Sequence, residues 1–155
     1  MSQTEKTMNE SLFTQYDGYD DQYGDLDIST IVGKTLIAVN VVESHTGDDH
    51  IMMKFDDGTY YKMFHEQDCT EYVQIESIDV SLQHLIGSPI LVAEQRSTSD
   101  GDTDHYAKDG TDPDSSTWTF YRISNIRSTS VLRWYGMSNG YYSERVSFVR
   151  MILKP

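Results

Sequence analysis

Short apolar segments separated by turn residues run through most of the chain, and this pattern is typical of β-strands. The segment Thr35–Val42 is almost continuously apolar and rich in β-branched residues, so it is predicted to be a well-buried strand. The segment Tyr72–Ile78 alternates apolar and polar residues, which predicts a strand with one face in water. Further strands are predicted at Ile51–Phe55, Thr59–Phe64, Ile90–Glu94, Thr117–Ile126, Val131–Met137 and Tyr141–Met151.

This pattern predicts a mainly β fold. It favours a single small domain of about seven short, mostly antiparallel strands that form a sandwich, a barrel or a rolled sheet. One short helical turn is expected at Ser81–Ile86, where Asp79 or Ser81 can cap the start and Gly87 can end it. The length of 155 residues suits one domain, which we expect to span 28–155.

Two dipeptides in the chain are strong signals for β-hairpins. Asp57-Gly58 lies between two β-rich segments, and it predicts a hairpin closed by a type I′ turn, in which both turn residues have positive φ. Asn139-Gly140 predicts a second hairpin, between Val131–Ser138 and Tyr141–Phe148. A two-residue loop fixes the register of that hairpin and therefore which side chains share a face.

One face of the predicted C-terminal hairpin is a candidate ligand site. The opposite face, which carries Val131 and Phe148, is mostly apolar and is expected to pack in the core. The candidate face places Trp134 opposite Arg145, beside a gap left by Gly136, so a planar anionic ligand could stack on the indole and pair with the guanidinium. The predicted ligand-binding residues are Trp134, Tyr141, Ser143 and Arg145. The alternative is a cross-strand cation–π pair that only stabilises the hairpin.

Negative charge is concentrated in two segments of the chain, whose net charge is −13. Residues 1–27 hold seven acids and one lysine, and residues 98–115 hold six aspartates and one lysine, whereas residues 116–155 carry a net positive charge. The first segment lacks apolar periodicity and is expected to be a disordered acidic tail; the second is expected to be an acidic loop. The acids predicted to contact a partner include Asp17, Asp20, Asp21, Asp100, Asp102 and Asp104.

A polar cluster follows the strand predicted at 59–64. It contains His65, Asp68, Cys69 and Glu71, which are residue types that bind transition metals or transfer protons. The spacing matches no zinc signature, because such signatures pair their ligands more closely. The alternative is structural: Cys69 is a small buried side chain and the acids cap the turn.

Motifs of the common enzyme classes are not found. The chain has no Walker loop, no G-x-S-x-G and no H-E-x-x-H, so no catalytic residue, metal or cofactor is assigned. Cys69 is the only cysteine, which favours a reducing compartment. The first residues are polar and no segment approaches the roughly 20 apolar residues of a membrane helix, so we expect neither a signal peptide nor membrane contact.

Four sequence blocks resemble the signature of a known family. They are Glu66–Glu71, Leu85–Ile90, Ser116–Tyr121 and Arg133–Glu144, the last of which reads Arg-Trp-Tyr-Gly-Met-Ser-Asn-Gly-Tyr-Tyr-Ser-Glu. In this order they resemble a domain of unknown function that is widespread in phage, prophage and plasmid genomes. The first block departs from the family pattern Gln-Asp-Cys-Cys-Glu, because Thr70 replaces the second cysteine, and this departure argues against a metal or redox role.

The resemblance implies a context and no activity. It favours a non-enzymatic binding or inhibitory protein in the host cytoplasm, where dense carboxylates that mimic a phosphate backbone could occupy a host nucleic-acid-binding or defence complex. The alternatives are sequestration of a nucleotide-like ligand at Trp134, a metal-dependent hydrolase around His65, and a structural component of the virion. Direct binding of the chain to DNA is disfavoured by its net charge.

Overall fold

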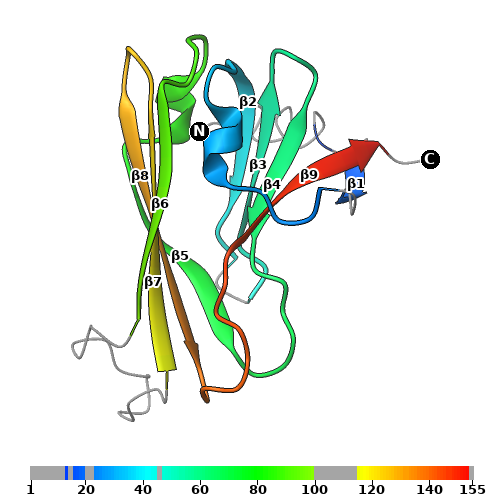
Figure 1. Cartoon of the computed structure of the whole chain (residues 1–155), viewed down its shortest axis with the longest axis vertical. Helices are drawn as coiled ribbons and strands as arrows, with labels where there is room; N and C mark the ends of the chain where they lie inside the picture. Colours follow the sequence, from blue (N-terminus) through cyan, green and yellow to red (C-terminus); the bar gives the residue numbers. More distant parts are fainter. Residues whose placement is uncertain (1–12, 14–15, 20–22, 45–46, 100–114, 154–155) are drawn as a thin grey trace.

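The computed structural model describes residues 13, 16–19, 23–44, 47–99 and 115–153, and these residues form a two-layer β-sandwich (Figure 1). One sheet has the strand order β1 (Tyr16–Tyr19), β9 (Ser147–Leu153), β4 (Tyr60–Phe64), β3 (His50–Phe55) and β2 (Leu36–Val42). The other has the order β5 (Tyr72–Asp79), β8 (Thr129–Ser138), β7 (Ser115–Ser124) and β6 (Val92–Ser99). All paired neighbours are antiparallel. The predicted mainly β fold is confirmed as a sandwich, and the described residues form no closed barrel.

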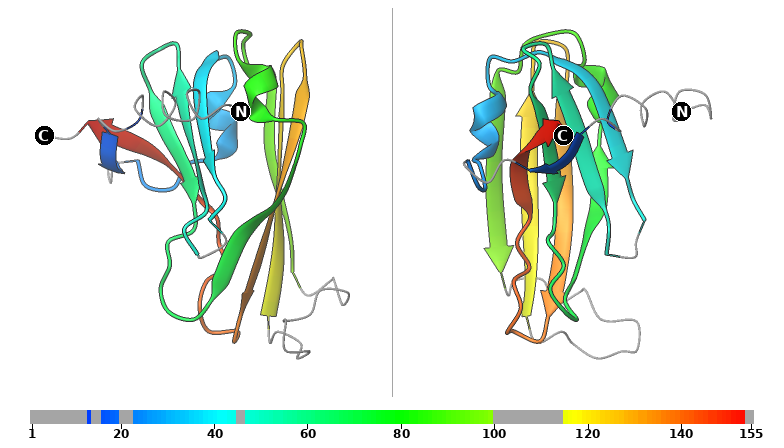
Figure 2. Two further views of the ribbon diagram at one scale, coloured as in Figure 1. Left: turned by 180° about the vertical axis from the view of Figure 1, so that it is seen from behind. Right: turned by 90° about the vertical axis from the view of Figure 1, so that its right-hand side faces the viewer.

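The hydrophobic core lies between the two sheets, which stand side by side in the left view of Figure 2 and one in front of the other in the right view. Val39, Met53 and Phe148 reach it from the five-stranded sheet, and Ile75 and Trp134 reach it from the four-stranded sheet. In β5, Val73 and Ile75 are buried and alternate with partly exposed residues, as a pleated strand with one face in a core requires.

Two 3-10 turns pack against this core. Ile28–Ile31 forms η1, in which Asp27 caps the start by accepting a hydrogen bond from the N–H of Ser29. Leu82–Leu85 forms η2, where the Ser81 side chain accepts from the N–H of Gln83, so the predicted helical turn and its cap are confirmed. No helix among the described residues is long and apolar enough to cross a membrane.

The hairpin predicted at Asp57-Gly58 joins β3 to β4, but its turn is not of type I′. Gly58 has a φ of 84°, whereas Asp57 stays outside the left-handed region, so only one turn residue has positive φ. The N–H of Phe55 donates to the carbonyl of Thr59, which places three residues in the loop. The Asp57 carboxylate is engaged by Thr59 and by the ammonium of Lys34, which fastens the turn to the end of η1.

The N-terminal segment contributes to the fold more than its composition indicates. β1 pairs with β9, and the N–H of Leu26 donates to the carbonyl of Phe148. Phe13 is buried against Tyr60, with their rings 5.7 Å apart, on the outer face of the five-stranded sheet. The prediction of a disordered tail over 1–27 is therefore wrong for residues 13, 16–19 and 23–27; the rest of that tail lies outside the described residues.

The predicted C-terminal hairpin does not form, because β8 and β9 belong to different sheets. Residues 139–146, here called the crossing segment, carry the chain from one sheet to the other at the lower end of the sandwich (Figure 1). The Asn139 side chain accepts a hydrogen bond from the N–H of Tyr141, which makes a local turn that does not return the chain along β8. β9 instead pairs with β4 and β1, where Phe148 faces the core and Val149 is buried on the outer face.

The crossing segment can pack closely on β8 only at a residue without a side chain. A Cβ added at Gly136 would lie 3.0 Å from Cβ of Glu144 and 3.1 Å from Cγ2 of Val73. The gap that the sequence suggested beside Gly136 is thus filled by Glu144 and Val73. The Glu144 carboxylate then accepts hydrogen bonds from the hydroxyls of Thr117 (2.7 Å) and Ser138 (2.5 Å).

We expect Gly136→Ala to destabilise the protein by about 2 kcal/mol, because the new methyl group must displace the crossing segment or the Val73 side chain. Denaturant unfolding of the variant and of Thr129→Ala, an exposed position on the same strand, measures the effect. A Gly136→Ala variant as stable as Thr129→Ala would contradict the close packing.

Candidate functional site

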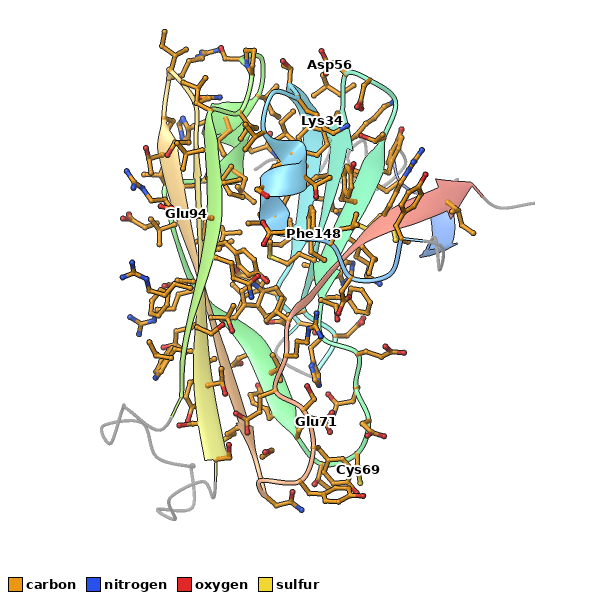
Figure 3. All side chains as sticks on the ribbon, viewed as in Figure 1. Lys34, Asp56, Cys69, Glu71, Glu94 and Phe148 are labelled. Atoms are coloured by element: carbon orange, nitrogen blue, oxygen red, sulfur yellow. The ribbon has the colours of Figure 1, made fainter. Side chains whose placement is uncertain are left out.

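The candidate site lies where the turn after β4 meets the crossing segment. A cavity of about 370 Å³ opens there, here called the acidic pocket. Its lining residues are Asp25, His65, Glu66, Gln67, Asp68, Glu71, Ser143, Arg145 and Ser147. Figure 3 shows Glu71 and Cys69 on this turn, beside the crossing segment at the lower end of the molecule. Four carboxylates border the cavity, so its walls carry more negative than positive charge.

Glu71 organises the turn from inside. Its carboxylate accepts hydrogen bonds from the backbone N–H groups of Asp68 (2.8 Å) and Cys69 (2.7 Å), and it lies 2.9 Å from Nε2 of His65. Burial by itself raises the pKa of Glu71, but these donors, led by the N–H of Cys69, outweigh it and lower the pKa to about 2. Glu71 is therefore an ionised structural anchor.

His65 links this anchor to the crossing segment. Its Nε2 faces the Glu71 carboxylate and its Nδ1 lies 2.7 Å from the backbone carbonyl of Arg145. Both partners are hydrogen-bond acceptors, so both ring nitrogens are engaged in contacts within the protein. A ring held in this way has no free nitrogen to abstract a proton or bind a metal, which supports a structural role for the buried His65–Glu71 pair.

Arg145 projects from the crossing segment into the mouth of the acidic pocket. Its Nη2 lies 2.8 Å from a carboxylate oxygen of Asp25, and two thirds of the arginine side chain is exposed. Such an exposed ion pair contributes about 0–1 kcal/mol to stability, so it costs little to open when a ligand or partner competes for either side chain.

The polar cluster predicted at 65–71 is only partly brought together. His65 and Glu71 are paired, and Asp68 lines the cavity while its N–H donates to Glu71. Cys69 is exposed and not a buried apolar side chain; a hydrogen bond with its thiol raises the pKa of Tyr142. Among the described residues, no group of three His, Cys, Asp or Glu side chains is arranged to hold a metal ion.

The ligand site predicted on the C-terminal hairpin is not formed. Trp134 is 1% exposed and lies in the core between the sheets, while Tyr141 is 83% exposed on the crossing segment. Only Ser143 and Arg145 of the predicted set come together, at the rim of the acidic pocket. The prediction failed because it assumed that β8 and β9 pair with each other. That register placed Trp134 on the exposed face of β8, whereas its side chain lies on the core face.

The cation–π contact predicted between Trp134 and Arg145 does not form, and Arg133 and Trp118 make such a contact instead. On the outer face of the four-stranded sheet, the guanidinium of Arg133 lies 4.4 Å from the ring centre of Trp118, which packs on Tyr135. The pairing of β7 with β8 sets this contact. A β7–β8 hairpin, signalled by the short loop between those segments, would have revealed it from the sequence.

Residues outside the predicted sets complete the acidic pocket. Asp25 and Glu66 add exposed carboxylates to its rim, and Gln67 holds the turn by donating to the backbone carbonyl of Glu71 at 2.7 Å. Of the acids predicted to contact a partner, Asp17 lies on β1. The others, Asp20, Asp21, Asp100, Asp102 and Asp104, lie outside the described residues.

The chain was compared with family models, curated proteins and solved structures. A family model described as "Domain of unknown function (DUF7448)" matches residues 6–148. No curated protein and no solved structure matches the chain.

The lowered pKa of Glu71 predicts an acid-sensitive component of stability. The folded pKa is about 2 and the reference value is 4.5, so this component is fully present above about pH 4.5 and is lost as the pH falls towards 2. We expect Glu71→Gln to lose about 3 kcal/mol near neutral pH and to differ less from the natural chain near pH 3.

Denaturant unfolding at about pH 7 and about pH 3 measures this difference. The matched control is Glu66→Gln, an exposed position on the same turn. Parallel pH profiles for Glu71→Gln and the natural chain would show that Glu71 does not supply the acid-sensitive component.

Proposed function

We propose that this chain, which belongs to the DUF7448 domain family, is a non-enzymatic binding or inhibitory protein that engages a basic partner. The partner we propose is a nucleic-acid-binding protein or defence complex in the cytoplasm of a phage's host. Dense carboxylates compete for such a partner because they present negative charge where it would otherwise meet phosphate.

The observation that carries the proposal is the gathering of carboxylates at one end of the sandwich. The acidic pocket lies at this end, with Asp25, Glu66 and Asp68 on its rim. The end of β6 at Ser99 and the start of β7 at Ser115 lie at the same end (Figures 1 and 2), and the chain between them holds six aspartates. The described residues on both sides of this acidic segment therefore lie at the same end as the acidic pocket.

The state of His65 supports binding over catalysis. It is the histidine of the acidic pocket, and both of its ring nitrogens are directed at acceptors. A general base needs a free ring nitrogen within reach of a substrate proton, and a metal ligand needs the same lone pair. Because His65 is engaged on both sides, the exposed carboxylates of the acidic pocket are the groups that can interact with a partner. Such carboxylates can form ion pairs with lysine and arginine side chains.

We expect the protein to capture a basic nucleic-acid-binding protein from host lysate at about 0.1 M salt and to release it at about 1 M, where the screening length falls from about 10 Å to about 3 Å. Capture with the immobilised chain, followed by mass spectrometry of the eluate, identifies the partner. Replacing Asp100, Asp102 and Asp104 with Asn should reduce capture, because these acids lie in the segment that we assign to the contact.

The control variant removes the same amount of charge elsewhere. Glu43, Asp79 and Glu94 are exposed and lie outside both acidic segments. Their neutralisation should leave capture unchanged. Equal losses in the two variants would mean that only net charge matters, and the absence of any salt-sensitive partner would refute the proposal.

A further inference from the structure

A second cavity also takes part of its wall from the crossing segment. Its volume is about 350 Å³, within the range of small-molecule sites. Its lining residues are Gln95 and Ser97 of β6, Ser115, Thr117 and Thr119 of β7, and Ser143, Glu144, Arg145 and Val146 of the crossing segment. Five of these nine residues carry a hydroxyl group, and we call the cavity the hydroxyl pocket.

The hydroxyl groups on β6 and β7 lie on the strand faces that contribute apolar side chains to the core further along each strand. On β7, the positions that face the other sheet hold Ile123 and Tyr121 in the core and then change to Thr119 and Thr117. The same change occurs on β6, where Ala93 is in the core and Gln95 and Ser97 line the pocket. Gln95 and Ser97 are exposed and Thr119 is buried, so the inward faces change here from an apolar core to a polar, partly open surface that suits a polar ligand.

Several of these groups have no hydrogen-bond partner within the described part of the chain. Thr119 is 3% exposed, and its hydroxyl makes no side-chain hydrogen bond with another described residue. The same holds for the hydroxyls of Ser97 and Ser115 and for the amide of Gln95. A ligand can therefore bond to these groups without first breaking a side-chain hydrogen bond within the described part of the chain.

The charges around the pocket are already balanced. Arg145 is paired with Asp25, and the Glu144 carboxylate accepts from Thr117 and Ser138. A phosphate would meet the Glu144 carboxylate in a chain whose net charge is −13, which disfavours an anion. An uncharged ligand that both donates and accepts hydrogen bonds matches the hydroxyl and amide groups that remain.

We propose that the hydroxyl pocket binds an uncharged molecule through a pair of adjacent hydroxyl groups, a vicinal diol, with Thr119, Ser97 and Gln95 as its main contacts. Such a diol can come from a free sugar or from the ribose of a nucleoside. The proposal does not rest on the basic partner proposed above, since Thr119, Ser97 and Gln95 are not among the residues that line the acidic pocket.

NMR titration with four probes tests the proposal: glucose, ribose, adenosine and 2′-deoxyadenosine, which lacks the vicinal diol. We expect saturable shifts with at least one of the first three. If the ligand is a free sugar, glucose or ribose binds; if it is a nucleoside, adenosine binds at least about fivefold more tightly than 2′-deoxyadenosine, because the lost hydroxyl leaves pocket groups unpaired.

Two variants locate the binding. Thr119→Val keeps the shape of the side chain and removes its hydroxyl, and it should weaken binding about fivefold. Ser97→Ala, at an exposed position, tests the same contact with little risk to folding. The matched control is Thr98→Val, which lies on the opposite face of β6 and should bind as the natural chain does.

Three results would overturn the proposal. The first is that glucose, ribose and adenosine all fail to saturate. The second is that a diol binds Thr119→Val and Ser97→Ala as tightly as it binds the natural chain. The third is that inorganic phosphate, titrated in parallel, produces saturable shifts at the pocket while the diols do not.

Discussion

The contact between His65 and the crossing segment holds together the end of the molecule at which the acidic pocket lies. It joins residues that are 80 positions apart in the chain, through a hydrogen bond to the carbonyl of Arg145, and on its other side the same ring bonds to Glu71. Because Glu71 also binds two backbone N–H groups of its own turn, the turn, the ring and the crossing segment form one connected unit. Both cavities take a wall from the crossing segment, so both depend on where this unit holds it.

Most of the strands could be predicted because their signals are local. The apolar β-branched segment that became β2 and the Asp-Gly turn between β3 and β4 needed no knowledge of distant residues. The helical turn η2 was also visible, because Ser81 is a local cap. By contrast, β1 is four residues long and contains Asp17 and Gly18, which are disfavoured in strands, and it is a strand only because β9 offers it an edge.

The candidate site was only partly predictable for the same reason. Asn139-Gly140 has the composition of a tight hairpin turn, but the choice between a hairpin and a crossing depends on which surfaces bury Trp134 and Phe148. Burying both residues between the sheets requires β9 to leave β8, and no local signal encodes that requirement. The pairing of His65 with Glu71 lies within one turn and could be anticipated, whereas Asp25 and Arg145 meet only after the chain has crossed.

One side chain belongs to both cavities. The guanidinium of Arg145 borders the acidic pocket and the hydroxyl pocket, and it is mostly exposed, so it can turn towards either. A molecule that binds the Arg145 guanidinium in one cavity removes this cation from the other cavity. Ligand binding in the acidic pocket and in the hydroxyl pocket is then thermodynamically linked. Linkage of this kind is reciprocal: whatever change in affinity the first ligand imposes on the second, the second imposes equally on the first.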